Sequence, residues 1–217
     1  MQDHLAQLPL FQGLPLTARK ELDEASEPRR FHKGEILFEE GRPAEAVWVI
    51  QRGWVYLVKR TPQGTPVTIF TVTPAEVLCG FSAAVWQGRY YASAVTATDT
   101  EAVRIPRARF AQHLRDQPGF AERVLTIYHT RMRHMAQAMS LAQAPVEQRL
   151  AYTLLRLRAT FGNTVPVTHR ELAHMAGTRW ETSIRTIATF KRQRWLVTAR
   201  GQITVLHHAS HGAVQQR

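Results

Sequence analysis

The segment between Thr178 and Arg192 carries acidic, basic and apolar side chains at a spacing that suits the reading of DNA bases. Glu181 and Arg185 are four residues apart, so in a helix they share one face, and Ile184 lies beside them. Arginine donates two hydrogen bonds to guanine, glutamate accepts one from cytosine, and an apolar side chain contacts the methyl group of thymine. The alternative is an exposed Glu–Arg pair that only stabilises its own helix. The pattern favours base readout.

A helix-turn-helix is the element that would present these side chains to DNA. Two short apolar-periodic segments flank Gly177, which is the pattern of two helices joined by a tight turn. Thr168 and Glu171 have the spacing of a capping box at the start of the first helix. Ile187 and Phe190 fall on the side of the second helix opposite the reading face. The second helix is therefore expected to be buried on one side and polar on the other.

Positive charge is concentrated around this predicted helix-turn-helix. The chain has 217 residues, 28 Lys and Arg, 17 Asp and Glu, and a formal net charge of +11. Residues 143–217 hold 11 of the basic residues and only 3 of the acidic ones. Such an excess indicates a polyanionic partner, either nucleic acid or an anionic membrane.

Strand patterns at 195–198 and 202–205 predict a hairpin wing beside the helices. Candidate contacts to DNA phosphates are Arg170, Arg179, Lys191, Arg192 and Arg200.

Upstream of this region, residues 29–106 show short β-branched and aromatic runs separated by Gly- and Pro-containing turns. Short strands at such regular spacing predict an antiparallel barrel or jelly roll whose interior can hold a ligand. The expected strands include residues 47–50, 54–58, 67–72, 92–97 and 101–105.

A long helix is predicted between Phe120 and Ala142. Its apolar residues recur at alternating intervals of three and four, which favours a parallel coiled-coil dimer over a helix packed on its own barrel. Pro145 ends the helix and is the expected hinge. The seam consists of Leu125, Tyr128, Met132, Met135, Met139 and Ala142. The expected fold is α+β, with a sensor barrel over 1–117, a dimerisation helix over 118–143 and a winged helix-turn-helix over 144–217.

The composition excludes several other classes of protein. The single cysteine, Cys79, allows no intramolecular disulfide and no all-cysteine zinc or iron–sulfur site. There is no signal-peptide pattern and no apolar run of the roughly 18 residues that a membrane span requires. We expect a cytoplasmic protein with no membrane partner.

The order of these parts resembles the cyclic-AMP receptor protein/fumarate-nitrate reductase regulator (CRP/FNR) family of bacterial transcription factors. The resemblance covers about residues 8–206 and rests on residues 34–45 and 50–55 in the barrel and on 168–185 in the helix-turn-helix. It implies a homodimer that binds double-stranded DNA at a palindromic promoter site, with RNA polymerase as a further partner if it activates transcription. The loop after Val58 lacks the acidic residues that contact polymerase in the family. Activation and repression therefore both remain open.

The resemblance also assigns roles within the second helix. In the family, the Glu and Arg of an E-T-x-x-R motif contact base edges, and Glu181 and Arg185 hold these positions. Thr182 resembles the family's phosphate-contacting threonine. Ser183 stands where the family has an apolar core residue, and Trp180 stands where the cyclic-AMP branch has an arginine. The half-site is therefore expected to be related to the family's but different from it. The candidate base-reading set is Trp180, Glu181, Ile184 and Arg185.

The effector site is where the chain departs most from the family. The Arg-Ser pair that holds the cyclic phosphate becomes Tyr90-Tyr91, and a buried phosphate without a counter-charge is prohibitively costly. Cyclic AMP is thus not expected, although Arg89 would substitute if the register differed by one. The haem-binding branch has a Cys near Cys79 and a His two residues later, where this chain has Phe81. No cofactor is predicted, and the effector, if one is needed, stays open. The candidate pocket is Leu78, Cys79, Gly80, Arg89, Tyr90, Tyr91, His134 and Met135.

Two alternative functions explain fewer features of the sequence than transcription regulation does. A cupin-type metal-dependent enzyme needs a His and carboxylate cluster on neighbouring strands, and the barrel region contains only His32. A ligand-binding module with a basic tail would show only nonspecific affinity for nucleic acid. We therefore expect a regulator of transcription without enzymatic activity.

Overall fold

The computed structural model describes residues 4–6, 8–74, 76–78 and 88–206. The chain divides into two compact units, Met1–Met132 and Arg133–Arg217, and the division falls within the long helix α4 (Pro118–Ser140). The expected subdivision of the chain at residues 117 and 143 remains a prediction.

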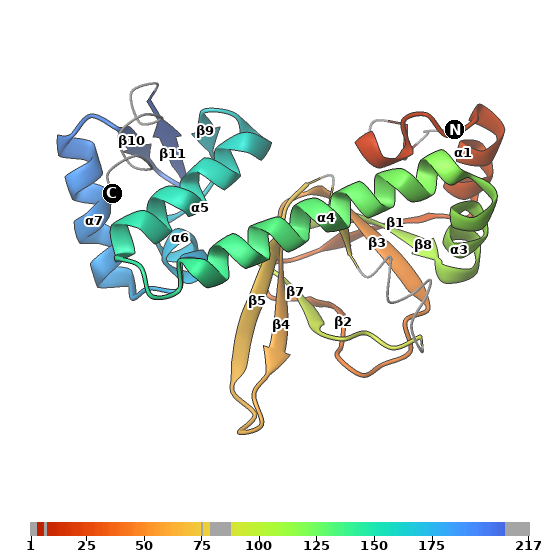
Figure 1. The fold of residues 1–217 in the computed structure, drawn as a ribbon, viewed down its shortest axis with the longest axis horizontal. Coiled ribbons are helices and arrows are strands. Elements are labelled where there is room, and N and C mark those ends of the chain that lie inside the picture. Colours follow the sequence, from red (N-terminus) through yellow and green to blue (C-terminus); the bar gives the residue numbers. More distant parts are fainter. Residues whose placement is uncertain (1–3, 7, 75, 79–87, 207–217) are drawn as a thin grey trace. The chain divides into compact units, whose positions relative to one another are not determined.

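The first unit contains two four-stranded antiparallel sheets in a jelly-roll-like arrangement (Figure 1), as predicted. The two sheets do not close into one continuous barrel. One sheet has the order β1 (Glu27–Phe31), β8 (Thr100–Pro106), β3 (Ala46–Arg52) and β6 (Val77–Leu78). The other has the order β2 (Ile36–Phe38), β7 (Ser93–Thr96), β4 (Val55–Arg60) and β5 (Pro66–Val72).

The strands follow from the alternation of side chains in the sequence. In β4, Val55 and Leu57 are fully buried, whereas Tyr56 and Val58 between them are half-buried. Successive side chains of a strand point to opposite faces, so one face of this sheet forms the core. Trp54, next to the strand, is also almost fully buried.

Helical segments complete the first unit: η1 (Pro9–Phe11), α1 (Leu16–Glu24), α3 (Arg107–Asp116) and the start of α4. An aromatic cluster joins three of them. The ring of Phe120 in α4 lies 5.7 Å from that of Phe11 in η1 and 5.3 Å from that of Phe110 in α3. All three rings are buried, so the cluster anchors the first turns of α4 to the sensor unit.

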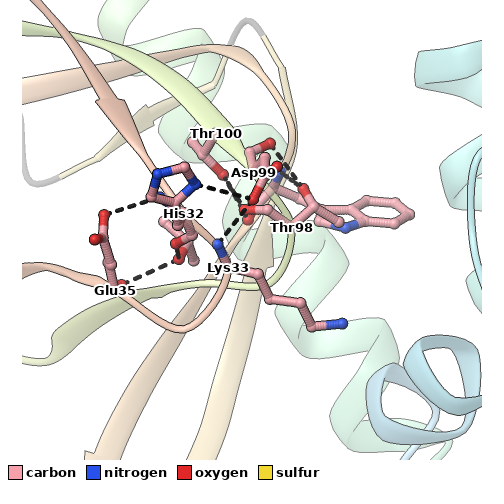
Figure 2. Close-up of polar contacts among 8 residues, drawn as sticks. His32, Lys33, Glu35, Thr98, Asp99 and Thr100 are labelled. Carbon is pink, nitrogen blue, oxygen red and sulfur yellow. Dashed lines mark hydrogen bonds and ion pairs between the residues drawn. The ribbon is translucent and has the colours of Figure 1, made fainter.

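Two turns that are distant in the sequence are held together at one end of the sheets (Figure 2). The backbone N–H of Lys33 donates to Asp99 Oδ1 at 3.0 Å. Thr96 Oγ1 donates to the carbonyl of His32 at 2.6 Å. The N–H of His32 donates to Glu35 Oε2 at 2.8 Å. A side chain at Gly53 would lie 2.4 Å from the Asp99 carbonyl, so only glycine fits beside this turn.

The second unit is a winged helix-turn-helix, as predicted. The capping box forms, because Thr168 Oγ1 accepts from the N–H of Glu171 at 3.2 Å and Glu171 Oε2 accepts from the N–H of Thr168 at 2.8 Å. Gly177 has a φ of +59° in the turn between the two helices. The elements are α5 (Val146–Phe161), β9 (Thr164–Val165), α6 (His169–Met175), α7 (Trp180–Arg192), β10 (Leu196–Ala199) and β11 (Gln202–Val205). The three strands form one sheet of order β10-β11-β9.

In the described part of the chain, no helix combines the length and the apolar character that crossing a membrane requires.

Candidate nucleic-acid interface and effector site

Helix α7 has one buried face and one exposed face. Ile187 and Phe190 are buried on the side that packs into the second unit. The predicted readers all lie on the exposed side: Trp180 is 45% exposed and Ile184 37%, and Glu181 and Arg185 are also exposed. A helix that is anchored on one face and carries donors, acceptors and apolar groups on the other has the form required in a major groove.

Ser183 belongs to the packing face and has no exposed surface. Its Oγ donates to the carbonyl of His169 at 3.4 Å, which joins α7 to the first residue of α6. A hydroxyl in the core is thus tolerated because it has a backbone acceptor. Ser183 therefore takes part in helix packing and does not belong to the exposed face of α7.

His169 lies where the two helices meet. Burial, and to a smaller extent the charge of Lys191, lower the pKa of His169 below its usual range. Both effects favour the neutral imidazole. His174, at the other end of α6, also has a pKa lowered by burial.

The predicted phosphate contacts surround the exposed face of α7. Arg179 is the N-cap residue, Thr182 is half-buried in the first turn, and Lys191 is exposed in the last turn. Arg192 is exposed there too, with Nη2 donating to Thr189 Oγ1 at 3.0 Å. The set therefore lies at both ends of the reading helix.

Two more predicted contacts come from neighbouring elements. Arg200, predicted to contact phosphate, lies in the exposed turn between β10 and β11. Arg170 is exposed near the start of α6, and its Cζ lies 5.5 Å from the centre of the Trp180 ring. The sequence did not predict this contact between the two helices.

Arg149 was also missed by the sequence analysis. Its Nη1 donates to the carbonyl of Gly177 at 2.9 Å, so α5 supports the turn of the helix-turn-helix. No local sequence pattern predicts this contact, because Arg149 and Gly177 are 28 positions apart in the chain. Arg149 thus holds the turn between α6 and α7 against α5.

The predicted dimer seam is exposed over most of its length. Leu125 is 54% exposed, Met132 69% and Met139 76%, and Tyr128 and Met135 are half-buried. Large apolar side chains exposed in a row on one helix are typical of a protein–protein contact. One member of the seam needs correction: α4 ends at Ser140, so Ala142 lies in the following turn and not on the helix.

The effector residues lie in different surroundings. Tyr90 is buried and stacks on Phe38 with ring centres 4.0 Å apart, and its hydroxyl donates to the carbonyl of Ala46 at 3.1 Å. Arg89 is exposed and donates to the carbonyl of Gly41 at 2.7 Å, so its guanidinium is not buried beside Tyr90. Tyr90, predicted to stand in place of the family's phosphate-binding arginine, is thus a packed aromatic ring.

The other pocket candidates complete this description. Leu78 is fully buried at the end of β6, and Tyr91 is 42% exposed. Cys79 and Gly80 lie outside the described residues. His134 and Met135 are half-buried in the second unit, where the His134 carbonyl accepts from Tyr152 Oη at 3.3 Å.

Arg131 is the only Lys or Arg that is buried among the described residues, and it is not among the residues predicted to have a role. Its Nη2 donates to the carbonyl of Val77 at 2.7 Å and lies 4.0 Å from Glu76 Oε1. Its guanidinium lies 5.1 Å from the centre of the Phe70 ring, and its Nε and Nη1 have no hydrogen-bond partner. Arg131 thus fastens the middle of α4 to β5 and β6 through a buried charge.

The residue on which a cupin-type metal site would depend is far from the core. His32 lies in the turn of Figure 2 with its side chain 88% exposed, and its Nδ1 is 3.8 Å from Asp99 Oδ1. Among the residues that the structure describes, no group of three or more His, Cys, Asp or Glu is placed to hold a metal ion.

The two units match two known domain families. Residues 28–117 match the cyclic nucleotide-binding domain, and residues 148–210 match the Crp-like helix-turn-helix domain. A sensor domain of this type followed by this DNA-binding domain defines a class of one-chain transcription regulators.

Known proteins of this class align with most of the chain. The cyclic AMP receptor protein of Thermus thermophilus is 30% identical over 184 residues, which is 82% of this chain and 83% of the relative. The CRP-like cAMP-activated global transcriptional regulator of Mycobacterium tuberculosis is 27% identical over 205 residues, 90% of this chain and 91% of the relative. The structure of FixK2 from Bradyrhizobium japonicum has the same fold, with a TM-score of 0.71 at 19% identity over 83% of this chain and 92% of that one. The chain belongs to the CRP/FNR family of transcription regulators.

Proposed function

We propose that this regulator acts as a homodimer that reads a palindromic promoter site through Trp180, Glu181, Ile184 and Arg185. The observation that carries the proposal is the exposed face of α7, where these four side chains lie together. Arg185 would donate to guanine N7 and O6, and Glu181 would accept from cytosine N4. Cations at both ends of the helix and on the wing would contact phosphates and set its orientation.

The homodimer is proposed from the exposed seam on α4. Leu125, Met132 and Met139 would pack against the same residues of a second copy, since a two-fold interface is self-complementary. Two reading helices would then lie about 34 Å apart, one turn of DNA, which matches a two-fold symmetric site.

The effector is proposed to differ from cyclic AMP, although two relatives are named for that nucleotide. The support is the packed ring of Tyr90, whose neighbour Arg89 is directed to the surface carbonyl of Gly41. Cyclic AMP at millimolar concentration is expected to leave the melting temperature unchanged. A saturable rise in melting temperature would contradict this part of the proposal.

Footprinting on the promoter of its own gene, followed by affinity measurements on the protected site, tests the main proposal. Arg185→Ala should cost about 1–3 kcal/mol on the cognate site and relax one base position in each half-site. The matched control is Lys191→Ala, which should weaken binding to cognate and scrambled DNA alike and reduce the salt slope by about one. The proposal fails if no palindrome is protected, or if the two variants behave alike on both DNAs.

A further inference from the structure

The first residue of the reading helix is an exposed tryptophan that is held by an arginine of the preceding helix. Trp180 is 45% exposed, yet the guanidinium carbon of Arg170 lies only 5.5 Å from the centre of its ring. A cation over an indole face is attracted to the ring, most strongly of all the aromatic side chains. The contact restricts the rotamers of Trp180 before DNA arrives, so less conformational entropy is lost on binding.

Ile184 extends the apolar surface of Trp180 along the helix. The two residues are four positions apart, so they are neighbours on one face of α7, and Ile184 is 37% exposed. Glu181 and Arg185 form a second, polar pair with the same spacing. The exposed side of α7 therefore carries two parallel stripes, an apolar one made of Trp180 and Ile184 and a polar one made of Glu181 and Arg185.

An apolar stripe can recognise only one feature of a base edge in the major groove. Thymine presents a C5 methyl group there, and cytosine presents a bare C5–H with its N4 donor. Trp180 has a single N–H donor and no acceptor, so it cannot make the two-bond contact of an arginine with guanine. Burying a methyl group against indole or isoleucine carbon is favourable by the ordinary hydrophobic effect.

We propose that the stripe of Trp180 and Ile184 selects thymines in each half-site by contacting their methyl groups, and that Arg170 is the positioning residue for Trp180. This inference rests on the proposed function, because it assumes that α7 enters the major groove. Two thymines, one for each apolar side chain, then accompany the bases read by Glu181 and Arg185. Arg170 serves the readout through the indole, in addition to any contact with phosphate.

Replacing thymine by deoxyuridine tests the proposal, because the exchange removes the methyl group and leaves base pairing intact. Each thymine of the protected half-site is replaced in turn, and affinity is measured for the full-length protein. Loss of one buried methyl contact should weaken binding about fourfold at two positions. Trp180→Ala should abolish the thymine preference at one of them, and Ile184→Ala at the other.

Variants of Arg170 separate positioning from simple phosphate contact. Arg170→Gln should reduce the thymine-to-deoxyuridine ratio at the position that depends on Trp180, and Arg170→Lys, which keeps a cation for the ring, should retain more of it. Lys191→Ala is the control and should lower affinity for both DNAs while the ratio stays constant. An Arg170→Gln protein that loses affinity with an unchanged ratio would reduce Arg170 to a phosphate contact and overturn its positioning role.

The outcomes also distinguish this inference from the proposed function. If Arg185→Ala relaxes a base position but no thymine exchange affects the wild-type protein, base readout stands and methyl recognition by the stripe is wrong. If neither substitution nor exchange alters sequence preference, both proposals fail together.

Discussion

Arg131 and Glu76 allow a sharp prediction about how the sensor unit holds α4. The side chain of Arg131 is only 4% exposed, and its Nη2 lies 4.0 Å from the counter-charge at Glu76 Oε1. Glu76 has a second role, because its Oε2 accepts from the N–H of Thr73 at 2.6 Å and from Thr73 Oγ1 at 3.0 Å. Replacing Glu76 by Gln keeps an oxygen acceptor for Thr73 and removes only the negative charge.

The expected cost of Glu76→Gln follows from the geometry. Breaking a fully buried ion pair by removing one partner costs about 3–5 kcal/mol, since the remaining charge is left without compensation. Glu76 is 22% exposed and its oxygen is at the limit of an ion pair, so we expect the free energy of unfolding to fall by a smaller amount, about 1–3 kcal/mol. Arg131→Met gives up the bond to Val77 but also removes the desolvation cost of the cation, and should change stability by less than about 1 kcal/mol.

A double-mutant cycle in urea provides the measurement, with protein concentration held constant because dimerisation would add to apparent stability. In the Arg131→Met background, Glu76→Gln should cost no more than about 0.5 kcal/mol, which gives a coupling energy of at least about 0.5 kcal/mol. Equal costs of Glu76→Gln in both backgrounds would refute the reasoning. So would a larger loss from Arg131→Met than from Glu76→Gln.

Three further predictions concern the cap, pH and assembly. Thr168→Ala should lower the free energy of unfolding by about 1 kcal/mol in chemical denaturation, because α6 loses its N-cap. Because the pKa of His169 is lowered in the folded protein, the unfolded chain binds a proton at a higher pH than the folded chain does. The free energy of unfolding should therefore fall as the pH drops below about 6.5. His169→Gln should flatten this dependence in urea titrations between about pH 7.5 and 5.5. Met132→Glu with Met139→Glu should shift sedimentation towards monomer, and an unchanged dimer would exclude the seam.

Local signals allowed much of the second unit to be predicted from the sequence. Helix α5 spans Val146–Phe161 between Pro145 and Gly162, two residue types that commonly stand at the beginning and the end of helices. The division of α7 into a buried face and an exposed face followed from helical spacing alone. The prediction of Ala142 on α4 was wrong because heptad spacing continued past Ser140, where the helix ends and a turn begins.

Local sequence patterns could not predict the contacts between elements that are distant in the sequence. The residues next to Arg131 in the sequence are those of an ordinary solvent-exposed stretch of helix. In the fold, however, its hydrogen-bond partner Val77 lies 54 positions away, and Phe70 lies on another strand. The cation over Trp180 likewise depends on how α6 and α7 cross, which spacing within one helix does not determine.

The residues to test for effector response are not only those that match the family's nucleotide site. The pocket candidates came from positions that match the family, and the structure directs Arg89 to the surface and packs Tyr90 against Phe38. The buried positive charge of the sensor unit instead comes from α4, through Arg131, and is fixed by partners on β5 and β6. Because α4 also carries the exposed seam, any change that alters the packing of Arg131 acts on the helix proposed to join the protomers. A substitution series aimed at effector response should therefore include Arg131 and Glu76 as well as the residues aligned with the family's nucleotide site.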